Sequence, residues 1–240
     1  MGLKKSTNRF IYKKYIKRPM DFVLSLLAII ILSPSFIVIA ILVRIKLGSP
    51  VIFKQERPGL NEKVFTMYKF RSMTDEKYEN GNFLPDSVRL TKFGKILRST
   101  SLDELPELFN ILKGNMSIVG PRPLLIRDMV FMTEEQRKRH DVYPGLTGWA
   151  QINGRNDITW EQKIIHDLEY IKNISFIKDL KIILITIVKV FKKDNISTKD
   201  MDTAEDLGDY LLRTGKIDKF EYEEKQQISI EVLKNNYTKG

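Results

Sequence analysis

The longest apolar stretch of the chain lies near its N-terminus. Residues 22–43 carry no charged side chain over 22 positions, and a helix of that length can cross the ~30 Å hydrocarbon core of a bilayer. Apolar residues on every side disfavour a buried helix of a soluble protein. The run is also long for a signal peptide and lacks a clear small-residue cleavage site. The pattern therefore predicts a membrane-embedded helix over residues 21–47.

A proline divides this helix in two. Ser33-Pro34-Ser35 stands at the midpoint, and each half of about 11 residues is about 16 Å long, which crosses one leaflet. Proline frees backbone groups, for which Ser33 and Ser35 are candidate partners. Both ends carry basic residues, namely Lys17, Arg18, Arg44 and Lys46, whereas the positive-inside rule expects one basic side. A re-entrant helix-break-helix and a kinked transmembrane helix both fit these residues.

A β-hairpin and several short elements follow. Gly48-Ser49-Pro50 ends the membrane helix, and residues 51–53 and 64–68 predict two strands around the turn sequence Pro58-Gly59-Leu60-Asn61. The pattern then predicts a polar loop (74–87), a short helix or turn (91–97), a helix that starts at Ser101 or Asp103 and closes at Lys113-Gly114, and a short strand (116–119).

The rest of the pattern is mainly helical. It predicts amphipathic helices over 124–141, 159–172 and 174–193, a glycine-rich loop over 143–156, and a helix around 202–214 in an acidic tail. The helix over 174–193 suits a position in the lipid headgroup plane, although an ordinary core helix has the same periodicity. Its lysines are Lys178, Lys181, Lys189, Lys192 and Lys193.

Composition narrows the chemistry. The 240 residues include no cysteine and only two histidines, His140 and His166, which excludes disulfides, cysteine zinc sites and thiol nucleophiles and disfavours a serine triad. His166 lies within a predicted helix and is interpreted as structural. Catalysis by this chain would therefore have to use carboxylates, arginines and a hard cation such as Mg²⁺.

The net charge of +10 is unevenly distributed. The tail from Asp194 onward carries −4, so the remainder carries +14. Residues 1–20 hold seven basic residues, no acid, and interleaved aromatics. Such a basic body implies an anionic partner: nucleic acid, phosphates or an anionic membrane surface. The apolar run that follows the arm favours lipid.

An adjacent acid pair is the strongest candidate for catalysis. Asp103-Glu104 lies between Arg98 and Arg122, and Ser101 stands in capping-box spacing to Glu104. Both acids are therefore expected at a helix N-terminus. Ordinary first-turn acids explain the pair, and so does a nucleophile beside a metal ligand; taken alone, the stretch favours the first interpretation. The Gly-Pro-Arg-Pro corner at 120–123 is expected to hold Arg122 in a fixed direction.

Basic and aromatic residues elsewhere are candidates for phosphate and base contacts. The hairpin carries four basic residues, Lys54, Arg57, Lys69 and Arg71. They form either a solvated face or a group of ligands for phosphate oxygens. In the loop 143–156, Arg155 is a candidate phosphate ligand and Trp149 or Tyr143 a stacking surface. The alternative for Trp149 is a side chain that plugs the core.

Together these stretches resemble the bacterial sugar transferase family, the monotopic polyprenyl-phosphate phosphoglycosyl transferases, over about residues 13–198. The matching stretches are KRPMD (17–21), Ser33-Pro34, IFKQERPG (52–59), YKFRSM (68–73), RSTSLDELPELFNILKGNMSIVGPRP (98–123) and PGLTGWAQINGRN (144–156). The short, single-domain members that prime glycan, capsule or exopolysaccharide assembly are the most similar subtype. The tail after residue 198 departs from that minimal pattern.

The resemblance implies a reaction and roles for residues. A phospho-sugar would pass from a UDP-sugar to undecaprenyl phosphate through a covalent aspartyl intermediate, with release of UMP and a requirement for Mg²⁺. Asp103 would be the nucleophile and Glu104 would help to hold the metal. Arg98, Arg122 and Arg155 are the preferred phosphate contacts, and Lys69 and Arg71 are weaker candidates because the alternative role of YKFRSM is to fold the hairpin.

The resemblance also implies an architecture and a location. It favours the re-entrant helix with its break at Ser33-Pro34, in an α+β, mostly helical, monotopic membrane protein at the cytoplasmic leaflet of the bacterial inner membrane. The expected segments are a basic juxtamembrane arm (1–20), a re-entrant helix (21–47), a cytoplasmic catalytic domain (48–198) and an acidic C-terminal appendage (199–240). The sequence does not identify the sugar.

Partners and rival functions complete the expectations. The expected partners are a UDP-sugar, undecaprenyl phosphate and anionic lipid, with a homodimer or downstream glycosyltransferases as protein partners to be considered and no nucleic acid. A membrane-tethered scaffold without catalysis is the main rival, against which the intact acid pair argues. A nucleic-acid binder is the second, suggested by a pI of about 9.5 and disfavoured by the apolar run.

Overall fold

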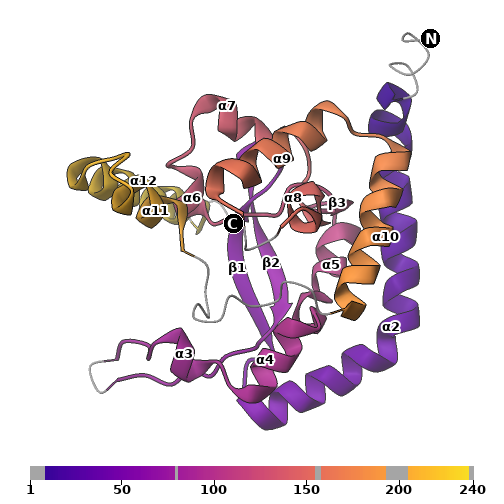
Figure 1. The fold of residues 1–240 in the computed structure, drawn as a ribbon. Coiled ribbons are helices and arrows are strands. Elements are labelled where there is room, and N and C mark those ends of the chain that lie inside the picture. The colour runs from indigo at the N-terminus through magenta and orange to yellow at the C-terminus, as the bar shows by residue number, and fades with distance from the viewer. Residues whose placement is uncertain (1–8, 79–80, 155–157, 193–204, 238–240) are drawn as a thin grey trace.

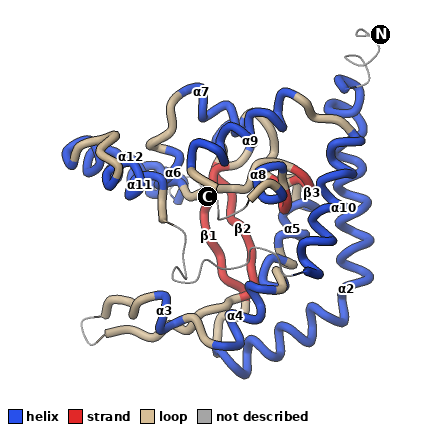
Figure 2. Tube along the Cα trace, in the orientation of Figure 1, coloured by secondary structure: helices blue, strands red, loops and turns tan. Residues whose placement is uncertain are grey.

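The computed structural model describes residues 9–78, 81–154, 158–192 and 205–237. Within these ranges the chain is mostly helical, as the sequence predicts, and it contains two small two-stranded sheets. Figure 2 shows the larger sheet at the centre with helices around it. Figure 1 shows the long N-terminal helix along one edge of the molecule and the C-terminal helices on the opposite side.

The N-terminal helix α2 (Lys17–Leu47) is continuous and follows a π-helical turn, η1 (Tyr12–Ile16). The expected interruption at Ser33-Pro34 is a change of direction about midway along the helix rather than a break in it (Figure 1). Ser33 Oγ donates to the carbonyl of Ile30 at 2.9 Å. That carbonyl is the acceptor that Pro34 cannot reach with an N–H, so Ser33 compensates for the proline as expected.

Both halves of α2 pack on the rest of the chain. In the first half, Ala28, Ile29 and Leu32 join a cluster that contains Leu108 and Met116. In the second half, Ile39, Val43 and Leu47 are buried against Phe70 and Leu97. The opposite side of the helix exposes large apolar residues, among them Ile30, Ile31, Ile37, Ile41 and Ile45. Among the described helices, only the stretch Arg9–Leu47 is long and apolar enough to cross a membrane.

The predicted hairpin is present, with longer strands. β1 (Ile52–Pro58) pairs antiparallel with β2 (Val64–Phe70), with Pro58 opposite Val64, around a short 3₁₀ turn, η2 (Leu60–Glu62). The helices α3 (Asp86–Arg89) and α4 (Lys92–Ser99) follow; α4 is the short helix predicted from residue 91 and is capped by Thr91. α3 begins at the end of the segment expected to be loop (74–87) and extends two residues beyond it.

A second sheet pairs two short strands in parallel. β3 (Ser117–Val119) is the predicted strand, whereas β4 (Gly145–Thr147) lies in a segment expected to be loop. A Cβ on Gly145 would stand 2.1 Å from the backbone nitrogen of Gly120. The glycine therefore permits a close approach of two backbone segments.

The expected helix over 124–141 is wrong. The chain forms three short helical segments instead: α6 (Ile126–Met129), α7 (Glu134–Arg137) and η4 (Lys138–His140). Thr133 and Gln136 form a reciprocal capping box that starts a new helix. The next elements are α8 (Trp149–Ile152), α9 (Trp160–Lys172) and α10 (Phe176–Lys192), of which the last two were predicted.

The tail contributes two helices that pack on the body. α11 (Leu207–Arg213) matches the helix expected around 202–214, and α12 (Lys219–Tyr237) was not predicted. Leu207 is buried with Phe131, Met132 and Trp160, and its backbone N–H donates to Asp128 Oδ1 at 2.9 Å. The division of the chain into four segments stays a prediction.

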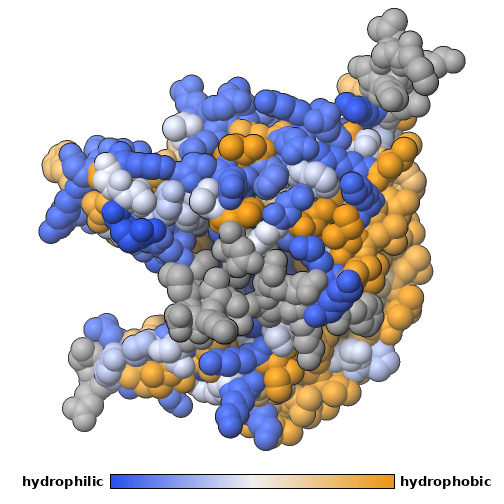
Figure 3. Space-filling view, viewed as in Figure 1, coloured by the Kyte–Doolittle hydropathy of each residue, from blue (hydrophilic) through white to orange (hydrophobic). Residues whose placement is uncertain are grey.

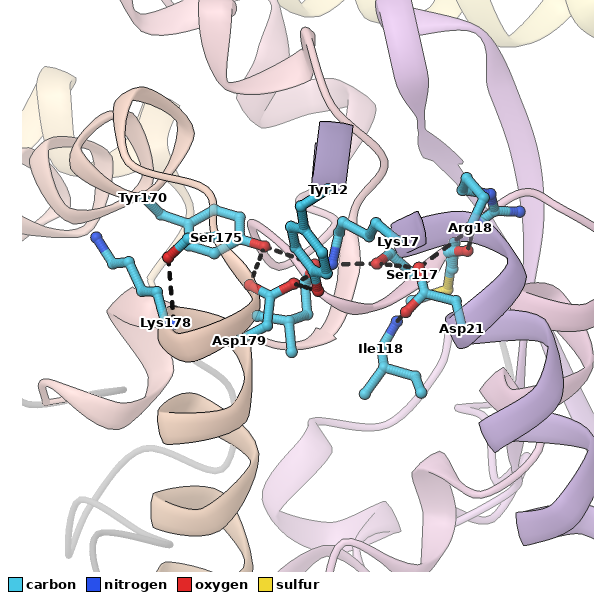
Figure 4. Close-up of polar contacts among 12 residues, drawn as sticks. Tyr12, Lys17, Arg18, Asp21, Ser117, Ile118, Tyr170, Ser175, Lys178 and Asp179 are labelled. Atoms are coloured by element: carbon cyan, nitrogen blue, oxygen red, sulfur yellow. Dashed lines mark hydrogen bonds and ion pairs between the residues drawn. The ribbon is translucent and has the colours of Figure 1, made fainter. Parts of the chain in front are cut away.

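A buried polar network joins α2 to α10 and β3 (Figure 4). Asp179 on α10 accepts hydrogen bonds from Tyr12 Oη (2.7 Å), Lys17 Nζ (2.6 Å) and Tyr170 Oη (2.8 Å). Asp21 accepts from Ser117 Oγ at 2.7 Å and from the N–H of Ile118 at 3.2 Å. The anchor network, as these residues are called below, fixes the start of α2 against the body. Its members are Tyr12, Lys17, Arg18, Asp21, Ser117, Tyr170 and Asp179.

Candidate functional site

The acid pair lies in a tight turn rather than at the start of an α-helix. Asp103 and Glu104 belong to a 3₁₀ turn, η3 (Leu102–Glu104), and α5 (Glu107–Leu112) begins only after Pro106. Ser101 has a left-handed backbone (φ 54°) and its side chain makes no capping bond. The expected capping box is therefore wrong, because the Glu104 side chain turns to partners elsewhere. α5 closes before Gly114 (φ 85°), as predicted.

Two basic residues from other segments contact Glu104, and a third acid, Glu107 of α5, shares one of them. Glu104 Oε1 accepts hydrogen bonds from Lys69 Nζ at 2.9 Å and Arg122 Nη2 at 2.6 Å. Lys69 Nζ also lies 3.1 Å from Glu107 Oε1. The three acids are 7%, 8% and 2% exposed for Asp103, Glu104 and Glu107, so their charges are largely removed from water. These five residues are called the carboxylate cluster below.

Burial and the shared cations shift the pKa values of the three acids in different directions. Burial, together with the Glu104 charge, raises the pKa of Asp103 to about 6. Burial also raises the pKa of Glu107 to about 7 although Lys69 opposes the rise. Glu104 is buried as well, but Arg122 and Lys69 hold its pKa well below the usual range. The cluster therefore contains one firmly ionised acid beside two acids with raised pKa values, a pattern typical of functional sites.

The predicted basic residues have different roles. Lys69 and Arg122 contact Glu104, as given above. Arg98 donates to Ser72 Oγ at 3.0 Å, and its charge lowers the pKa of Asp103 against the effect of burial. Arg71 donates to the carbonyls of Ser49 and Met73, both at 2.7 Å, and pairs with Asp75 at 2.9 Å. Arg71 thus holds the base of the hairpin, which was the alternative role given to YKFRSM.

The other candidates lie outside the cluster or outside the described residues. Arg155 lies outside the described residues. Lys178 Nζ lies over the Trp149 ring, 4.5 Å from the ring centroid, and Trp149 Nε1 donates to Glu169 at 2.9 Å. Arg18 lies over the Tyr143 ring at 4.3 Å. Cations of this chain therefore occupy the aromatic faces that were considered for base stacking. Ser33 and Pro34 shape α2, as described above.

Glu107 is the member of the cluster that the sequence reasoning missed. It follows Asp103 by four positions and Glu104 by three, which places residues on one side of a helical segment. That spacing was the available signal. The contact with Lys69 depends on the packing of β2 against α5 and does not follow from local sequence.

A cavity of about 260 Å³ borders the carboxylate cluster. Ser101, Glu104 and Arg122 supply polar groups at its wall, and most of the remaining lining is aliphatic. The aliphatic members come from the turn after Glu104, from β3 and β4, from α8 and from α10. They are Leu105, Ile118, Leu146, Ile152, Ile183, Ile187 and Val190. An anionic group joined to a hydrocarbon is complementary to such a surface.

The acid pair suits a metal that shares its ligands with a substrate. Among the described residues, no group of three or more histidine or acidic side chains has the arrangement of a protein-only metal site. Mg²⁺ commonly binds through one or two carboxylates together with substrate phosphates and water. Asp103 and Glu104 supply such carboxylates, and a cation there would offset the excess of buried negative charge. The donor set therefore fits a magnesium ion bound with substrate.

Comparisons with known proteins show what the chain is similar to. The family model described as bacterial sugar transferase matches residues 12–193. The uncharacterized sugar transferase EpsL of Bacillus subtilis (strain 168) is 51% identical over 190 residues, which cover 79% of this chain and 94% of that protein.

Two longer relatives are named for an activity. The UDP-glucose:undecaprenyl-phosphate glucose-1-phosphate transferase of Klebsiella pneumoniae is 44% identical over 191 residues, which cover 73% of this chain and 40% of the relative. The undecaprenyl-phosphate galactose phosphotransferase of Salmonella typhimurium is 34% identical over 198 residues, 75% of this chain and 41% of the relative. The chain thus spans about two fifths of the length of these two proteins.

Proposed function

Because the chain belongs to the bacterial sugar transferase family, we propose that it transfers a phospho-sugar from a UDP-sugar to undecaprenyl phosphate, through a covalent intermediate on Asp103. The observation that carries the proposal is the carboxylate cluster: a buried aspartate beside a glutamate that holds two cations, at the wall of a largely aliphatic cavity. The names of the relatives, undecaprenyl-phosphate sugar phosphotransferases, support the choice of acceptor.

In the first step, an Asp103 carboxylate oxygen attacks the phosphorus that is bonded to the sugar. The new bond joins that oxygen to phosphorus, the phosphoanhydride bond breaks, and its electron pair leaves with UMP. A pKa of about 6 leaves Asp103 mostly ionised at pH 7. Its poor solvation makes the carboxylate more reactive than an exposed one, and its place in a tight turn holds it in a fixed direction.

In the second step, an oxygen of undecaprenyl phosphate attacks the same phosphorus. The bond to Asp103 breaks and the carboxylate is restored, so that the product is undecaprenyl diphosphate sugar. No proton needs to be abstracted because both nucleophiles are already anions near neutral pH. The same carboxylate serves as attacking group and leaving group, which explains why one aspartate suffices.

Charge compensation is the main task of the surrounding residues. Every reacting group is anionic, so cations must approach the phosphates. Arg122 lines the cavity and is the preferred phosphate ligand, with Arg98 beside Asp103. Lys69, held between Glu104 and Glu107, supports Glu104. Glu104 and Asp103 would hold Mg²⁺, which when bound neutralises phosphate charge.

The packing of α2 supports a monotopic arrangement. Lys17 and Asp21 at its start and Val43 and Leu47 at its end are buried against the same body. A straight spanning helix would place its two ends on opposite sides of a bilayer. The bent helix instead keeps both ends with the body and exposes its apolar side, which fits a re-entrant helix in the cytoplasmic leaflet. α10, with exposed Ile177, Leu184 and Val188, would lie at the same interface.

The reaction is tested by UMP release. Purified protein in detergent with undecaprenyl phosphate and Mg²⁺ is offered a panel of UDP-sugars, and we expect UMP from at least one of them and none after chelation with EDTA. With the UDP-sugar alone, UMP should be released once per enzyme molecule as the intermediate forms. Failure to release UMP from any sugar would favour the non-catalytic scaffold.

The membrane arrangement is tested by cysteine accessibility. The chain has no native cysteine, so single substitutions report without background. Lys14→Cys and Lys46→Cys lie at exposed positions near the two ends of the helix. We expect both to react from the cytoplasmic side in inverted vesicles and neither from the outside of intact cells. Labelling from opposite sides would establish a spanning helix. We expect Pro34→Ala to straighten the helix and shift the labelling of one end.

A further inference from the structure

The cavity beside the carboxylate cluster is enclosed on one side by α10. This helix has three kinds of apolar position. Ile182 is fully buried in the core (0% exposed), Ile183 and Ile187 line the cavity, and Leu184 and Val188 are exposed. Ile187 is itself 47% exposed. Ile187 therefore borders both the cavity and the outer apolar surface, so the cavity is continuous with that surface.

That outer surface is part of a larger apolar face. Figure 3 shows hydrophobic residues gathered along the edge of the molecule formed by α2 and α10. Both helices carry large exposed apolar residues, among them Ile30, Ile31 and Ile45 on α2 and Ile177, Leu184 and Val188 on α10. A hydrocarbon chain in the bilayer can therefore reach the cavity along Ile187 without crossing water.

The polar groups inside the cavity are mostly engaged with one another. Thr147 Oγ1 and Thr186 Oγ1 are hydrogen-bonded at 2.7 Å, and Thr186 also donates to the carbonyl of Ile182 at 2.8 Å. Gln151 Nε2 donates to the carbonyl of Leu146 at 3.2 Å, whereas its buried Oε1 has no hydrogen-bond partner among the described residues. With their hydrogen bonds made internally, the two threonines offer methyl groups to a ligand. The interior therefore favours hydrocarbon over a nucleotide, whose base and ribose need many polar partners.

Three charged residues line the cavity, and one of them, Lys189, comes from α10. Glu104 and Arg122 contribute to its wall, and they are paired at 2.6 Å. A phosphate bound there would lie next to the acid pair, with its ester-linked chain directed past Ile118 and Leu146 toward Ile187. At about 260 Å³ the cavity is slightly smaller than a pocket for a drug-sized ligand, about 300 Å³ or more. It suits part of a long chain rather than a whole nucleotide sugar.

We propose that this cavity binds the isoprene units next to the phosphate of the polyprenyl acceptor, and that α10 forms the entrance from the bilayer. The inference rests on the proposed function for the identity of the acceptor. It adds that the chain is recognised at its phosphate end by protein side chains, while the remaining units stay in lipid. Recognition then depends on the first units and little on total chain length.

Two variants on one helix test the subsite. Ile187→Trp fills the entrance, and Leu184→Trp places the same side chain at an exposed position of α10 that does not line the cavity. We expect Ile187→Trp to raise the KM for undecaprenyl phosphate by at least about tenfold, as hydrophobic-pocket misfits do, and to leave the single release of UMP from UDP-sugar alone unchanged. Leu184→Trp should match the wild type in both measurements.

The acceptor half-reaction is then compared with a short acceptor. If the cavity binds the first units, Ile187→Trp should impair farnesyl phosphate and undecaprenyl phosphate by the same factor. Equal effects of the two tryptophan variants would overturn the proposal, because they would reflect membrane association alone. Loss of the UMP release in Ile187→Trp alone would also overturn it, since the cavity would then belong to the donor.

A binding measurement separates this proposal from the proposed function. Farnesyl phosphate with a photoreactive diazirine in the isoprene unit next to the phosphate is irradiated with the full-length protein, and the labelled peptides are identified by mass spectrometry. We expect labelling in β4 and α10, competed by undecaprenyl phosphate. Labelling confined to the outer face of α2 would refute the subsite. If the wild type releases no UMP from any sugar, the transferase proposal fails, and the labelling still decides whether the cavity binds prenyl phosphates.

Discussion

The carboxylate cluster and the anchor network bury similar residue types with different charge balance. In the anchor network, Lys17 pairs with Asp179 at 2.6 Å, and Arg18 lies 3.8 Å from Asp21. Asp179 receives two further hydrogen bonds from tyrosines. In the carboxylate cluster, three acids share Lys69 and Arg122. The anchor network is neutral by count, and the carboxylate cluster keeps an excess of one negative charge when all its acids are ionised.

This difference separates positioning from chemistry. A buried carboxylate that accepts several hydrogen bonds is stable and unreactive, because its oxygen lone pairs are already engaged. Two acids with raised pKa values, as at Asp103 and Glu107, are an unfavourable arrangement unless a cation or a reaction makes use of them. The carboxylate cluster also borders a cavity. Buried charge by itself therefore does not indicate a catalytic site, whereas unbalanced buried charge beside a cavity does.

Removal of the proposed nucleophile should have the largest effect. We expect Asp103→Asn to lower UMP release by at least about 1000-fold, since covalent catalysis fails without the attacking carboxylate. Folding should persist, because the substitution removes charge from an electrostatically crowded cluster. Turnover is measured as UMP formed per enzyme, and folding as the melting temperature. Asp141→Asn, at an exposed acid, is the matched control. Wild-type turnover in Asp103→Asn would exclude Asp103 as the nucleophile.

Breaking the anchor network should act on stability instead. Asp179→Leu leaves the Lys17 ammonium buried without its carboxylate, and we expect the loss of about 3 kcal/mol in the free energy of unfolding. Lys17→Met is the companion single variant, and the double variant restores electrical balance. The double variant should recover part of the loss, as a double-mutant cycle by denaturant titration in detergent will measure. Strictly additive losses would show that the two side chains do not act as a pair.

The sequence predicted the elements whose signals are local. The hairpin turn, the starts of α4 and α9, and the proline in α2 all follow from neighbouring residues. The sequence singled out Asp103, Glu104 and Arg122 as candidates, but the contact of Arg122 with Glu104 at 2.6 Å was not predicted. The helix over 124–141 was wrong although Thr133 and Gln136 stand in capping-box spacing, so here the local signal existed and was overlooked.

The remaining features depend on tertiary packing. Glu107 joins the cluster only because β2 brings Lys69 to α5. Arg71 resembles a phosphate ligand in sequence, yet its donors meet backbone carbonyls that local pattern does not position. In the sequence, Asp179 is a polar residue within an apolar helix. Its role follows only from its contact with Lys17, which is 162 positions away. α12 has no clear apolar stripe, and Tyr222 contributes by stacking on Phe131.

A smaller effect should follow from a single neutral donor of the anchor network. Ser117→Ala removes the 2.7 Å hydrogen bond to Asp21 Oδ2. Asp21 keeps the N–H of Ile118 and the nearby Arg18, so we expect a loss of about 1–2 kcal/mol in stability and little change in turnover per folded molecule. Melting temperature and UMP release, measured on the same preparation, check both parts. A loss of turnover larger than the loss of folded protein would contradict a purely positioning role.

The smallest effect should have the opposite sign. Glu107 is the third acid of the carboxylate cluster, and its pKa is raised by burial to about 7 from an ordinary 4.5. Between these two values the folded chain binds more protons than the unfolded chain, so ionisation of Glu107 reduces stability as pH rises from about 4.5 to 7. Glu107→Gln removes this dependence while keeping a partner for Lys69. We therefore expect the variant to be as stable as the wild type at pH 5 and more stable by up to about 1 kcal/mol at pH 8, with turnover reduced no more than about tenfold.

Melting temperatures at the two pH values measure the effect, and Ser117→Ala, which carries no titrating group, should show no pH-dependent gain over the wild type. A loss of stability at pH 8 would show that Glu107 is needed to balance Lys69, and that the carboxylate cluster is built on the same principle as the anchor network.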